Sequence, residues 1–401
     1  MDYPVSAKMR SLKPSAIREI FRYAADPSYI SLAAGSPAPE ALPVKLAQRL
    51  MAQVLEEMPM TALQYNMSEG YAPLRQALRD YLSSRHNIIK AFDDLIITSG
   101  AQHAMDLTAK VLCDEGDTVI CEEPSFIGSL NTFRSYGIKL AGVPMESDGI
   151  DIIRLEEKLY ANPHAKFIYV IPNFQNPTGI TMSLEKRKAV YALAKKYGTL
   201  ILEDNPYGDL RFAGEALPSI KSMDEDGIVF YAGTFSKILS PGIRVGYLIA
   251  PEAIMGKIIV AKQCTDVHTN MLGQSLCHRF MTQCDVDAHI SSLKSIYAHK
   301  CSLMLSEMEK HFPRTVTWAK PEGGLFIWAD MGMDGAEIAA RLVAEKRVCI
   351  VPGSAFSTDE NTNTTTARFN FSTPPDDKII TAIGLAGELL REIVREGTIH
   401  N

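Results

Sequence analysis

The chain has 401 residues, 46% of them hydrophobic and 22% charged, and a formal net charge of −6 at pH 7. The length suits about two or three domains, and the mild acidity argues against nucleic acid or an anionic membrane surface as the main partner. Since no apolar run reaches the roughly 18 residues of a membrane helix and the N-terminus lacks a signal-peptide pattern, we expect a soluble, cytoplasmic protein.

The seven cysteines include no CxxC pair. Cys264, His268, Cys277, His278 and Cys284 lie close together in the sequence, but their spacing matches no common zinc site. We therefore expect no metal, and we interpret the cysteines as core or surface thiols that stay reduced.

Short apolar runs alternate with helical patterns through the middle of the chain. The runs cover 95–98, 118–121, 167–171, 200–202, 228–231 and 245–249. Helical patterns follow the first two runs, from Ala101 to Leu112 and from near Ser125. Short, continuously apolar strands separated by helices indicate a mostly parallel sheet covered on both faces, and hence an α/β fold.

A basic cluster, Lys186-Arg187-Lys188, lies between two of these runs and follows Ser183. A serine just before a helical pattern is typical of an N-cap. We interpret the three cations as a solvent-exposed helix face.

The pattern changes beyond about Pro251. Residues 254–311 are predicted to form long helices, residues 321–371 to hold short strands, and residues 376–395 to form a last amphipathic helix. Residues 357–366, rich in Thr and Asn, are predicted as a polar loop. We expect a large α/β domain followed by a smaller α+β domain.

Polar residues follow the ends of three predicted strands. Ser99-Gly100-Ala101-Gln102 sits at a strand-to-helix junction, where free backbone N–H groups favour an anion. The loop Asn173–Gly179 could hold Asn176 over a ligand, at the crevice where open α/β sheets bind. The run Glu203–Tyr207 places a carboxylate, Asp204, three residues before a phenol. Each segment by itself is equally typical of an ordinary turn or N-cap.

The stretch Thr234–Arg244 places one lysine, Lys237, among hydroxyls, with an arginine seven residues on. A lysine amine forms a Schiff base with an aldehyde, while hydroxyls and a guanidinium suit a phosphate. An aldehyde that carries a phosphate is pyridoxal 5'-phosphate (PLP). The stretch therefore indicates a PLP site, although by itself it also fits a solvated loop.

Taken in order, these segments resemble the class I and II aminotransferases, a family of fold-type I PLP enzymes, and in particular its 2-aminoadipate and kynurenine branch. The resemblance begins at Ser15–Ile20, passes through Ala34–Glu40 and ends at Ala367–Ser372, so it covers nearly the whole chain. Independent weak motifs rarely occur together in one order by chance.

The resemblance implies a division of the chain as well as a fold. The large PLP-binding domain would have a mostly parallel, mixed sheet covered by helices, and the small domain would be α+β. An N-terminal segment would pack with the small domain. The implied bounds are 1–45 for the N-terminal segment, 46–285 for the large domain and 286–401 for the small domain.

The resemblance also implies a role for each matched residue. Lys237 would hold PLP covalently and move a proton between atoms of the substrate and the cofactor. Asp204 would accept a hydrogen bond from the pyridine N–H, and Asn176 and Tyr207 would bind the phenolic oxygen. The phosphate would be bound by Gly100, Ala101, Gln102, Thr234, Ser236 and Arg244.

Further matched residues would contact the ring, the substrate or a second subunit. Phe126 stands where the family usually stacks a tyrosine on the ring, so a hydroxyl is missing here. Tyr65 matches a tyrosine that reaches the phosphate of the neighbouring subunit, which implies a homodimer with shared active sites. Arg368 would bind the substrate α-carboxylate, Gly35 would also lie at the substrate, and Arg18 would meet a second, distal carboxylate.

The implied activity is a ping-pong transfer of an amino group from an L-amino acid to a 2-oxo acid, with 2-oxoglutarate as the expected acceptor. Another PLP reaction, such as a C–S lyase or decarboxylase reaction, is an alternative, because fold does not fix chemistry. A ligand-sensing regulator would carry a winged-helix domain, and the family pattern already begins by Ser15, which disfavours that interpretation. Aromatic, branched-chain, 2-aminoadipate and kynurenine donors all stay open.

Overall fold

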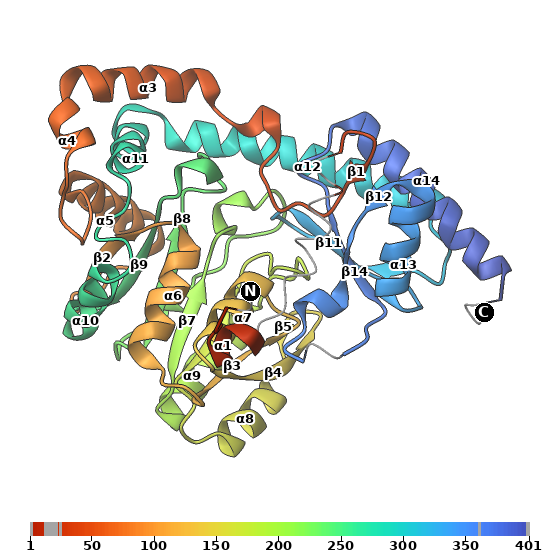
Figure 1. The fold of residues 1–401 in the computed structure, drawn as a ribbon, viewed down its shortest axis with the longest axis horizontal. Helices are drawn as coiled ribbons and strands as arrows, with labels where there is room; N and C mark the ends of the chain where they lie inside the picture. The colour runs from red at the N-terminus through yellow and green to blue at the C-terminus, as the bar shows by residue number, and fades with distance from the viewer. Residues whose placement is uncertain (1–2, 12–22, 24–25, 360–361, 398–401) are drawn as a thin grey trace.

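An eight-stranded mixed sheet forms the centre of the larger part of the molecule in this computed structural model, which describes residues 3–11, 23, 26–359 and 362–397 (Figure 1). The strand order is β2-β9-β8-β7-β6-β3-β4-β5. Strands β8, β7, β6, β3 and β4 run parallel, whereas β9 is antiparallel to both β2 and β8. The expected α/β fold with a mostly parallel, mixed sheet is confirmed.

The strands of this sheet are β2 (Asp93–Thr98), β3 (Thr118–Glu123), β4 (Lys139–Glu146), β5 (Gly149–Ile150), β6 (Phe167–Val170), β7 (Leu200–Asp204), β8 (Val229–Thr234) and β9 (Gly246–Pro251). The six predicted apolar runs coincide with six of them. The sequence prediction missed β4 and β5. Strand β4 lies near the sheet edge and is only partly buried, so it lacks the continuous apolar run of the central strands.

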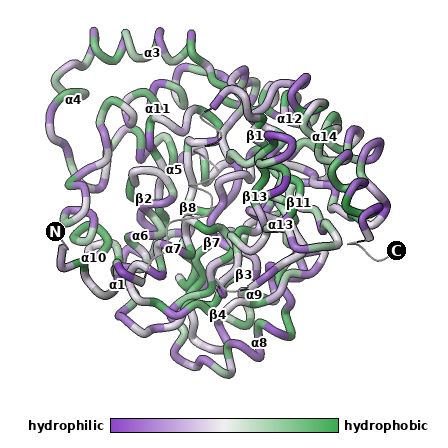
Figure 2. Tube along the Cα trace, turned by 45° about the vertical axis from the view of Figure 1, so that its right-hand side comes forward, coloured by the Kyte–Doolittle hydropathy of each residue, from purple (hydrophilic) through white to green (hydrophobic). Residues whose placement is uncertain are grey.

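Alternate residues of the central strands face opposite layers of helices, as strand geometry requires. Ile96 and Tyr169 pack with one layer, which contains α6 (Ala101–Leu112), α7 (Ile127–Ser135) and α10 (Glu252–Gln263). Their neighbours Ile97 and Ile168 face the other layer. That layer contains α3 (Val44–Glu57), α5 (Ala72–His86), α8 (Ile152–Ala161), α9 (Leu184–Tyr197) and α11 (Met271–Gln283). Figure 2 shows apolar residues concentrated along the central strands.

The interpretation of the basic cluster at the start of α9 is wrong for one of its members. Ser183 does cap the helix, since its hydroxyl accepts from the Lys186 N–H. Arg187, however, is fully buried and donates to the carbonyls of Pro172 and Pro218 at 3.0 Å and to Asn173 Oδ1 at 2.7 Å. These acceptors come from two distant loops, so a buried arginine fastens the loop of Asn176 to the helix.

The smaller part has a four-stranded antiparallel sheet in the order β10-β11-β14-β13. Its strands are β10 (Thr317–Trp318), β11 (Phe326–Asp330), β13 (Val351–Pro352) and β14 (Thr366–Asn370). Its helices are α13 (Gly335–Arg341) and α14 (Asp376–Arg395), and the long helix α12 (Val286–His311) runs into it from the larger part (Figure 1). The last predicted helix and α14 have the same bounds.

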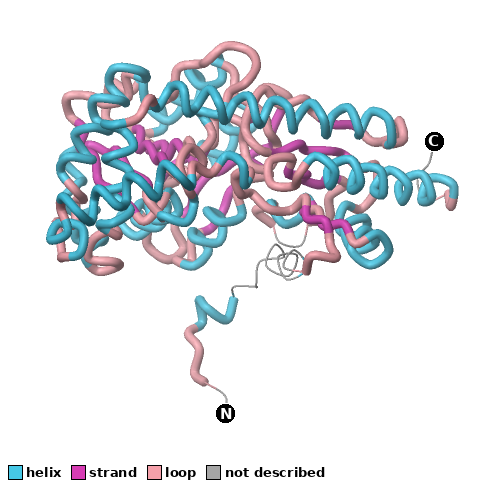
Figure 3. The backbone as a smooth tube through the Cα atoms, turned by 90° about the horizontal axis from the view of Figure 1, so that it is seen from above, coloured by secondary structure: helices cyan, strands magenta, loops and turns pink. Residues whose placement is uncertain are grey.

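The chain before α3 contributes to this smaller part. Strand β1 (Ile30–Ser31) pairs in parallel with β12 (Val348–Cys349), and Leu32 joins the same core. Two further short helices among the described residues are α1 (Ala7–Ser11) and α4 (Pro59–Leu63), and α1 projects away from the body (Figure 3). Among the described helices, none is long and apolar enough to cross a membrane.

Candidate active site

A cavity of about 410 Å³ opens at the carboxyl ends of β7 and β8, between the two parts of the molecule. Polar residues reach it from turns that follow several strands, as is typical of open α/β sheets. The cavity brings together these residues predicted from the sequence: Gly35, Ala101, Gln102, Phe126, Asn176, Asp204, Tyr207, Thr234, Ser236, Lys237, Arg244 and Arg368. Gly100 lies beside it, in contact with Arg244.

Lys237 projects into this cavity from the turn after β8, and its Nζ donates to the carbonyl of Gly35 at 2.7 Å. Burial lowers the pKa of Lys237 to about 8, and the nearby charges of Arg368 and Arg244 act in the same direction. A large fraction of the amine is therefore neutral near pH 8. The neutral amine is the form that attacks a carbonyl.

Asp204, the last residue of β7, is buried at the floor of the cavity. Its Oδ2 accepts from the Tyr169 hydroxyl at 2.8 Å, and that hydroxyl accepts from Ser129 Oγ at 2.9 Å. Its Oδ1 has no partner within the described part of the chain. Burial raises the pKa of Asp204 to about 7. An unpartnered buried carboxylate oxygen beside a cavity suits a ligand that brings an N–H donor.

Sequence reasoning missed Tyr169, which lies in the apolar run of β6. A signal was present, because a buried phenol usually finds a hydrogen-bond partner. Its partner could not be read from the sequence, since it depends on how β6 pairs with β7.

An anion-binding cradle forms where β2 enters α6 and where β8 ends. Arg244 donates to the carbonyl of Ser99 at 3.3 Å and reaches Ser236 Oγ at 3.5 Å. Thr234 Oγ1 donates to Ser236 Oγ at 2.9 Å. No side chain caps α6 at Gly100, and the His103 N–H donates to the Gly100 carbonyl, so the N–H groups of Ala101 and Gln102 are the ones available to a ligand. Hydroxyls, a guanidinium and free N–H groups together suit a phosphate.

Gln102 is placed at the cavity, but its side-chain amide donates to the Gly128 carbonyl at 2.9 Å and to Thr132. Its side chain therefore braces the start of α7 in this structure. The ring of Phe126, the residue that precedes α7, lines the same wall.

Gly100→Ala should weaken PLP binding by about tenfold or more. The backbone there has a φ of +81°, and an added Cβ would collide with the Arg244 guanidinium. Equilibrium dialysis of PLP against the purified protein measures the effect. Gly116→Ala is the matched control, because Gly116 has a φ of +89° but open space around its Cβ position. Equal affinity losses in both variants would contradict a local role for Gly100.

Arg368, on β14, is buried opposite Lys237. It donates to Asn176 Oδ1 at 2.8 Å and to the Ala33 carbonyl at 2.7 Å, and its Nε has no partner within the described part of the chain. Asn176 Nδ2 donates to the Tyr207 hydroxyl at 3.4 Å. Burial lowers the pKa of Arg368 to about 10, so the guanidinium stays charged at neutral pH.

One predicted residue that the structure describes, Tyr65, does not line the cavity. Tyr65 is 80% exposed, and its ring packs edge-on to His268. Arg18 lies outside the described residues, as does the Ser15–Ile20 segment.

Comparisons with known proteins identify the family of this chain. The family model for aminotransferase class I and II matches residues 27–383. The chain belongs to this aminotransferase family. It is 38% identical to aromatic-amino-acid aminotransferase 1 of Thermococcus litoralis, over 98% of this chain and 95% of the relative.

Two solved structures are similar to this aminotransferase. The kynurenine aminotransferase of Pyrococcus horikoshii has a TM-score of 0.93 at 35% identity, over 97% of each chain. The alpha-aminoadipate aminotransferase of Thermus thermophilus, complexed with N-(5'-phosphopyridoxyl)-L-leucine, has a TM-score of 0.89 at 32% identity, over 98% of each chain. The enzyme is a PLP-dependent transaminase, which confirms the cofactor expected from the sequence.

The residues of this aminotransferase fit PLP at three separate points. Asp204 lines the cavity with an Oδ1 that has no partner among the described residues, the cradle around Arg244 suits a phosphate, and Lys237 offers an amine of lowered pKa. Each point matches a different chemical group of one molecule: ring nitrogen, phosphate and aldehyde. The cavity is also of the size usual for small-ligand sites.

Proposed function

We propose that the enzyme transfers the amino group of an L-amino acid to 2-oxoglutarate by a ping-pong route. The observation that carries this proposal is the pair Lys237 and Arg368, which face one cavity from the two parts of the molecule. One supplies an amine and the other an unfilled guanidinium N–H for a substrate carboxylate. Relatives named for aromatic amino acids, kynurenine and 2-aminoadipate support an amino-acid donor.

PLP, when bound, supplies the electron-withdrawing ring that stabilises a carbanion at the substrate Cα. Asp204 would keep the ring nitrogen protonated through its free Oδ1, while Tyr169 holds the other oxygen in place. The substrate amine would displace the Lys237 amine from the aldehyde carbon of the cofactor. Lys237 would then be free to take the proton from the substrate Cα and deliver it to that aldehyde carbon. Asn176 and Tyr207 would bind the phenolic oxygen.

A donor panel tests the proposal. Purified enzyme with 2-oxoglutarate and one donor at a time, drawn from aromatic, branched-chain, kynurenine and 2-aminoadipate substrates, should release glutamate with at least one class. The visible spectrum of the bound cofactor is followed in the same experiment. Consumption of the donor without glutamate, together with release of ammonia or CO2, would instead favour a lyase or a decarboxylase.

Arg368→Ala should lower kcat/KM for every donor by about 10- to 1,000-fold, because it removes the carboxylate partner from a desolvated site. Arg18→Ala should affect glutamate, 2-aminoadipate and 2-oxoglutarate alone if Arg18 meets the distal carboxylate. Single-turnover rates with leucine and with glutamate separate the two roles. Equal losses for leucine and glutamate in Arg18→Ala would rule out the distal role.

We also propose that the enzyme is a cytoplasmic homodimer, with the division 1–45, 46–285 and 286–401 given above. An exposed apolar stretch around Tyr65 supports the dimer. Met60, Leu63 and Met67 are 73%, 68% and 64% exposed, and such a run is typical of a covered surface. In the proposed dimer, Tyr65 reaches the phosphate of the partner's cofactor.

Mixed dimers test the sharing of active sites. Tyr65→Phe and Lys237→Ala subunits, mixed and allowed to exchange, should form hybrids in which one site carries both defects and the other carries neither. The activity of the mixture should then exceed that of either parent. Native mass spectrometry checks that exchange occurred, and exchange without recovered activity would show that each site is built within one subunit.

A further inference from the structure

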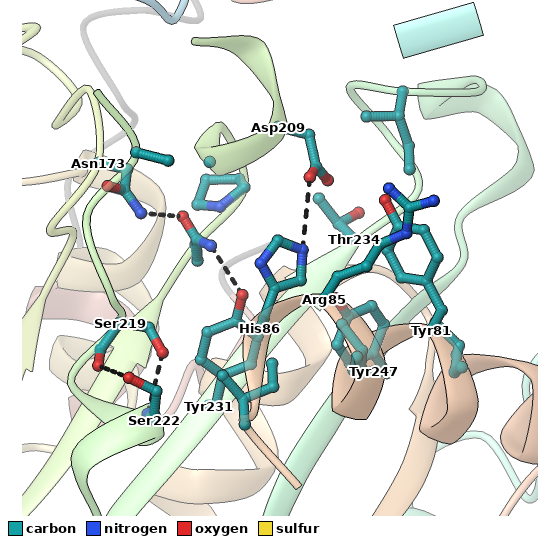
Figure 4. A pocket seen from close by; sticks show the side chains of 18 of the residues that line it. Tyr81, Arg85, His86, Asn173, Asp209, Ser219, Ser222, Tyr231, Thr234 and Tyr247 are labelled. Atoms are coloured by element: carbon teal, nitrogen blue, oxygen red, sulfur yellow. Dashed lines mark hydrogen bonds and ion pairs between the residues drawn. The ribbon is translucent and has the colours of Figure 1, made fainter. Parts of the chain in front are cut away.

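A second cavity, of about 400 Å³, lies behind the segment that carries Lys237. Its walls come from α5, the turns after β7, the strands β8 and β9, and α11 (Figure 4). Thr234 and Pro206 line both cavities, whereas Phe235 and Ile238 line the second one alone. A single turn of chain therefore separates the two, and of the side chains assigned to the amino-transfer site only Thr234 also lines the second cavity.

The walls of this second cavity combine aromatic, apolar and polar side chains. They include Tyr81, Tyr231, Tyr247, Phe235 and Phe280. The rings of Tyr231 and Tyr247 are stacked, with centroids 6.4 Å apart and planes inclined by 26°. The Arg85 guanidinium already lies 5.0 Å from the centroid of the Tyr81 ring. Aromatic faces of this kind attract cations.

Asp209 provides the one carboxylate among the described residues that line this cavity. Figure 4 shows it facing His86, whose Nε2 lies 4.0 Å from its Oδ1, beyond hydrogen-bond distance. No hydrogen-bond donor in the described ranges reaches this carboxylate, and the side chain is 34% exposed. Burial raises the pKa of Asp209 despite the opposing charges of His86, Lys294 and Arg85.

The arginines of the same cavity are already bound by carboxylates. The two terminal nitrogens of the Arg85 guanidinium donate to Asp287, and Arg211 donates to Glu322 at 2.6 Å. Among the described residues, the Asp209 carboxylate therefore has only its long ion pair with His86, at 4.0 Å, in a partly desolvated place. A cation brought by a ligand would stabilise the charged form of a carboxylate in that position. A bare metal ion would find too few oxygen ligands here.

We propose that this second cavity binds an organic ammonium ion, with its charge against Asp209 and its apolar substituents against Tyr231, Tyr247 and Phe235. This function is separate from amino transfer and does not depend on which donor the enzyme uses. A bound ion would touch Phe235 and Ile238, and so would press on the chain that carries Lys237.

Choline and its uncharged isostere 3,3-dimethylbutan-1-ol form the test pair, measured by titration calorimetry on the holoenzyme. A quaternary ammonium has no N–H and does not condense with PLP, so its binding is not active-site chemistry. Choline should bind saturably with one site per chain, and the alcohol at least about tenfold more weakly. Equal binding of the two, or no binding of choline at millimolar concentration, would overturn the proposal.

Two variants locate the site. Asp209→Asn keeps the shape of the side chain and should weaken choline binding by about tenfold while leaving the alcohol unchanged. Glu225→Gln removes an equal charge from an exposed residue that lines neither cavity, and it should change neither affinity. Native choline affinity in Asp209→Asn would place the ion elsewhere and defeat the assignment. If Asp209→Asn does not fold, the ligand pair on the native enzyme still decides.

Discussion

Lys237→Ala should reduce transamination on the order of 10⁴-fold, because one substitution removes both the covalent attachment point and the proton carrier. The purified variant should still bind PLP through the cradle around Arg244, but without the absorption of the covalent form. Single-turnover spectra with excess donor measure the loss. Borohydride reduction of the native enzyme should fix the cofactor to the peptide that contains Lys237.

Lys257→Ala is the matched control for this substitution. Lys257 lies on α10 with its side chain exposed, and it lines neither cavity, so its removal should leave the rate unchanged. A labelled peptide that carries any other lysine, or a Lys237→Ala enzyme with native turnover, would show that the attachment point lies elsewhere.

Asp204→Asn should lower kcat by about 10²- to 10³-fold with a smaller effect on cofactor affinity. The amide keeps the shape and can still accept from Tyr169, but it carries no charge to hold the ring nitrogen protonated. The loss should therefore appear in the proton-transfer step, in single-turnover measurements with a Cα-deuterated donor. Tyr169→Phe removes the hydrogen bond to Asp204 Oδ2, together with the one from Ser129, but leaves the Asp204 charge in place and should cost much less.

A thermal unfolding curve of each variant, taken without PLP, separates catalysis from folding. Asp204→Asn is expected to unfold near the native temperature, because the exchange removes a desolvated charge whose Oδ1 has no partner within the described part of the chain. Near-native turnover in a correctly folded Asp204→Asn enzyme would contradict the role of this carboxylate.

Residues that follow strand ends could be predicted from the sequence because strand ends are visible as limits of apolar runs. Asn176, Asp204 and Lys237 each come a few residues after such a run, and parallel strands bring their carboxyl ends to one edge. The resemblance then placed Arg368, which lies far away in the sequence on a strand of the smaller part. No local pattern at Arg368 distinguishes it from a surface arginine.

Two features could not be predicted, for related reasons. The contact of Tyr169 with Asp204 depends on the pairing of β6 with β7, and strand register is a property of the whole sheet. The burial of Arg187 depends on carbonyls of Pro172 and Pro218, which belong to loops with no periodic signal. Rules based on charge runs assume solvent around each cation, and that assumption fails where distant loops meet.

The backbone just after β1 connects the two halves of the enzyme through two hydrogen bonds. The Ala33 carbonyl is held by Arg368 from the smaller part, and two residues later the Gly35 carbonyl is held by Lys237 from the larger part, each at 2.7 Å. The halves cannot move apart along this seam unless one of these bonds breaks. The Lys237 amine cannot hold the Gly35 carbonyl and act as a nucleophile at the same time. Any group that reacts with Lys237 therefore also breaks one of the two hydrogen bonds between the halves.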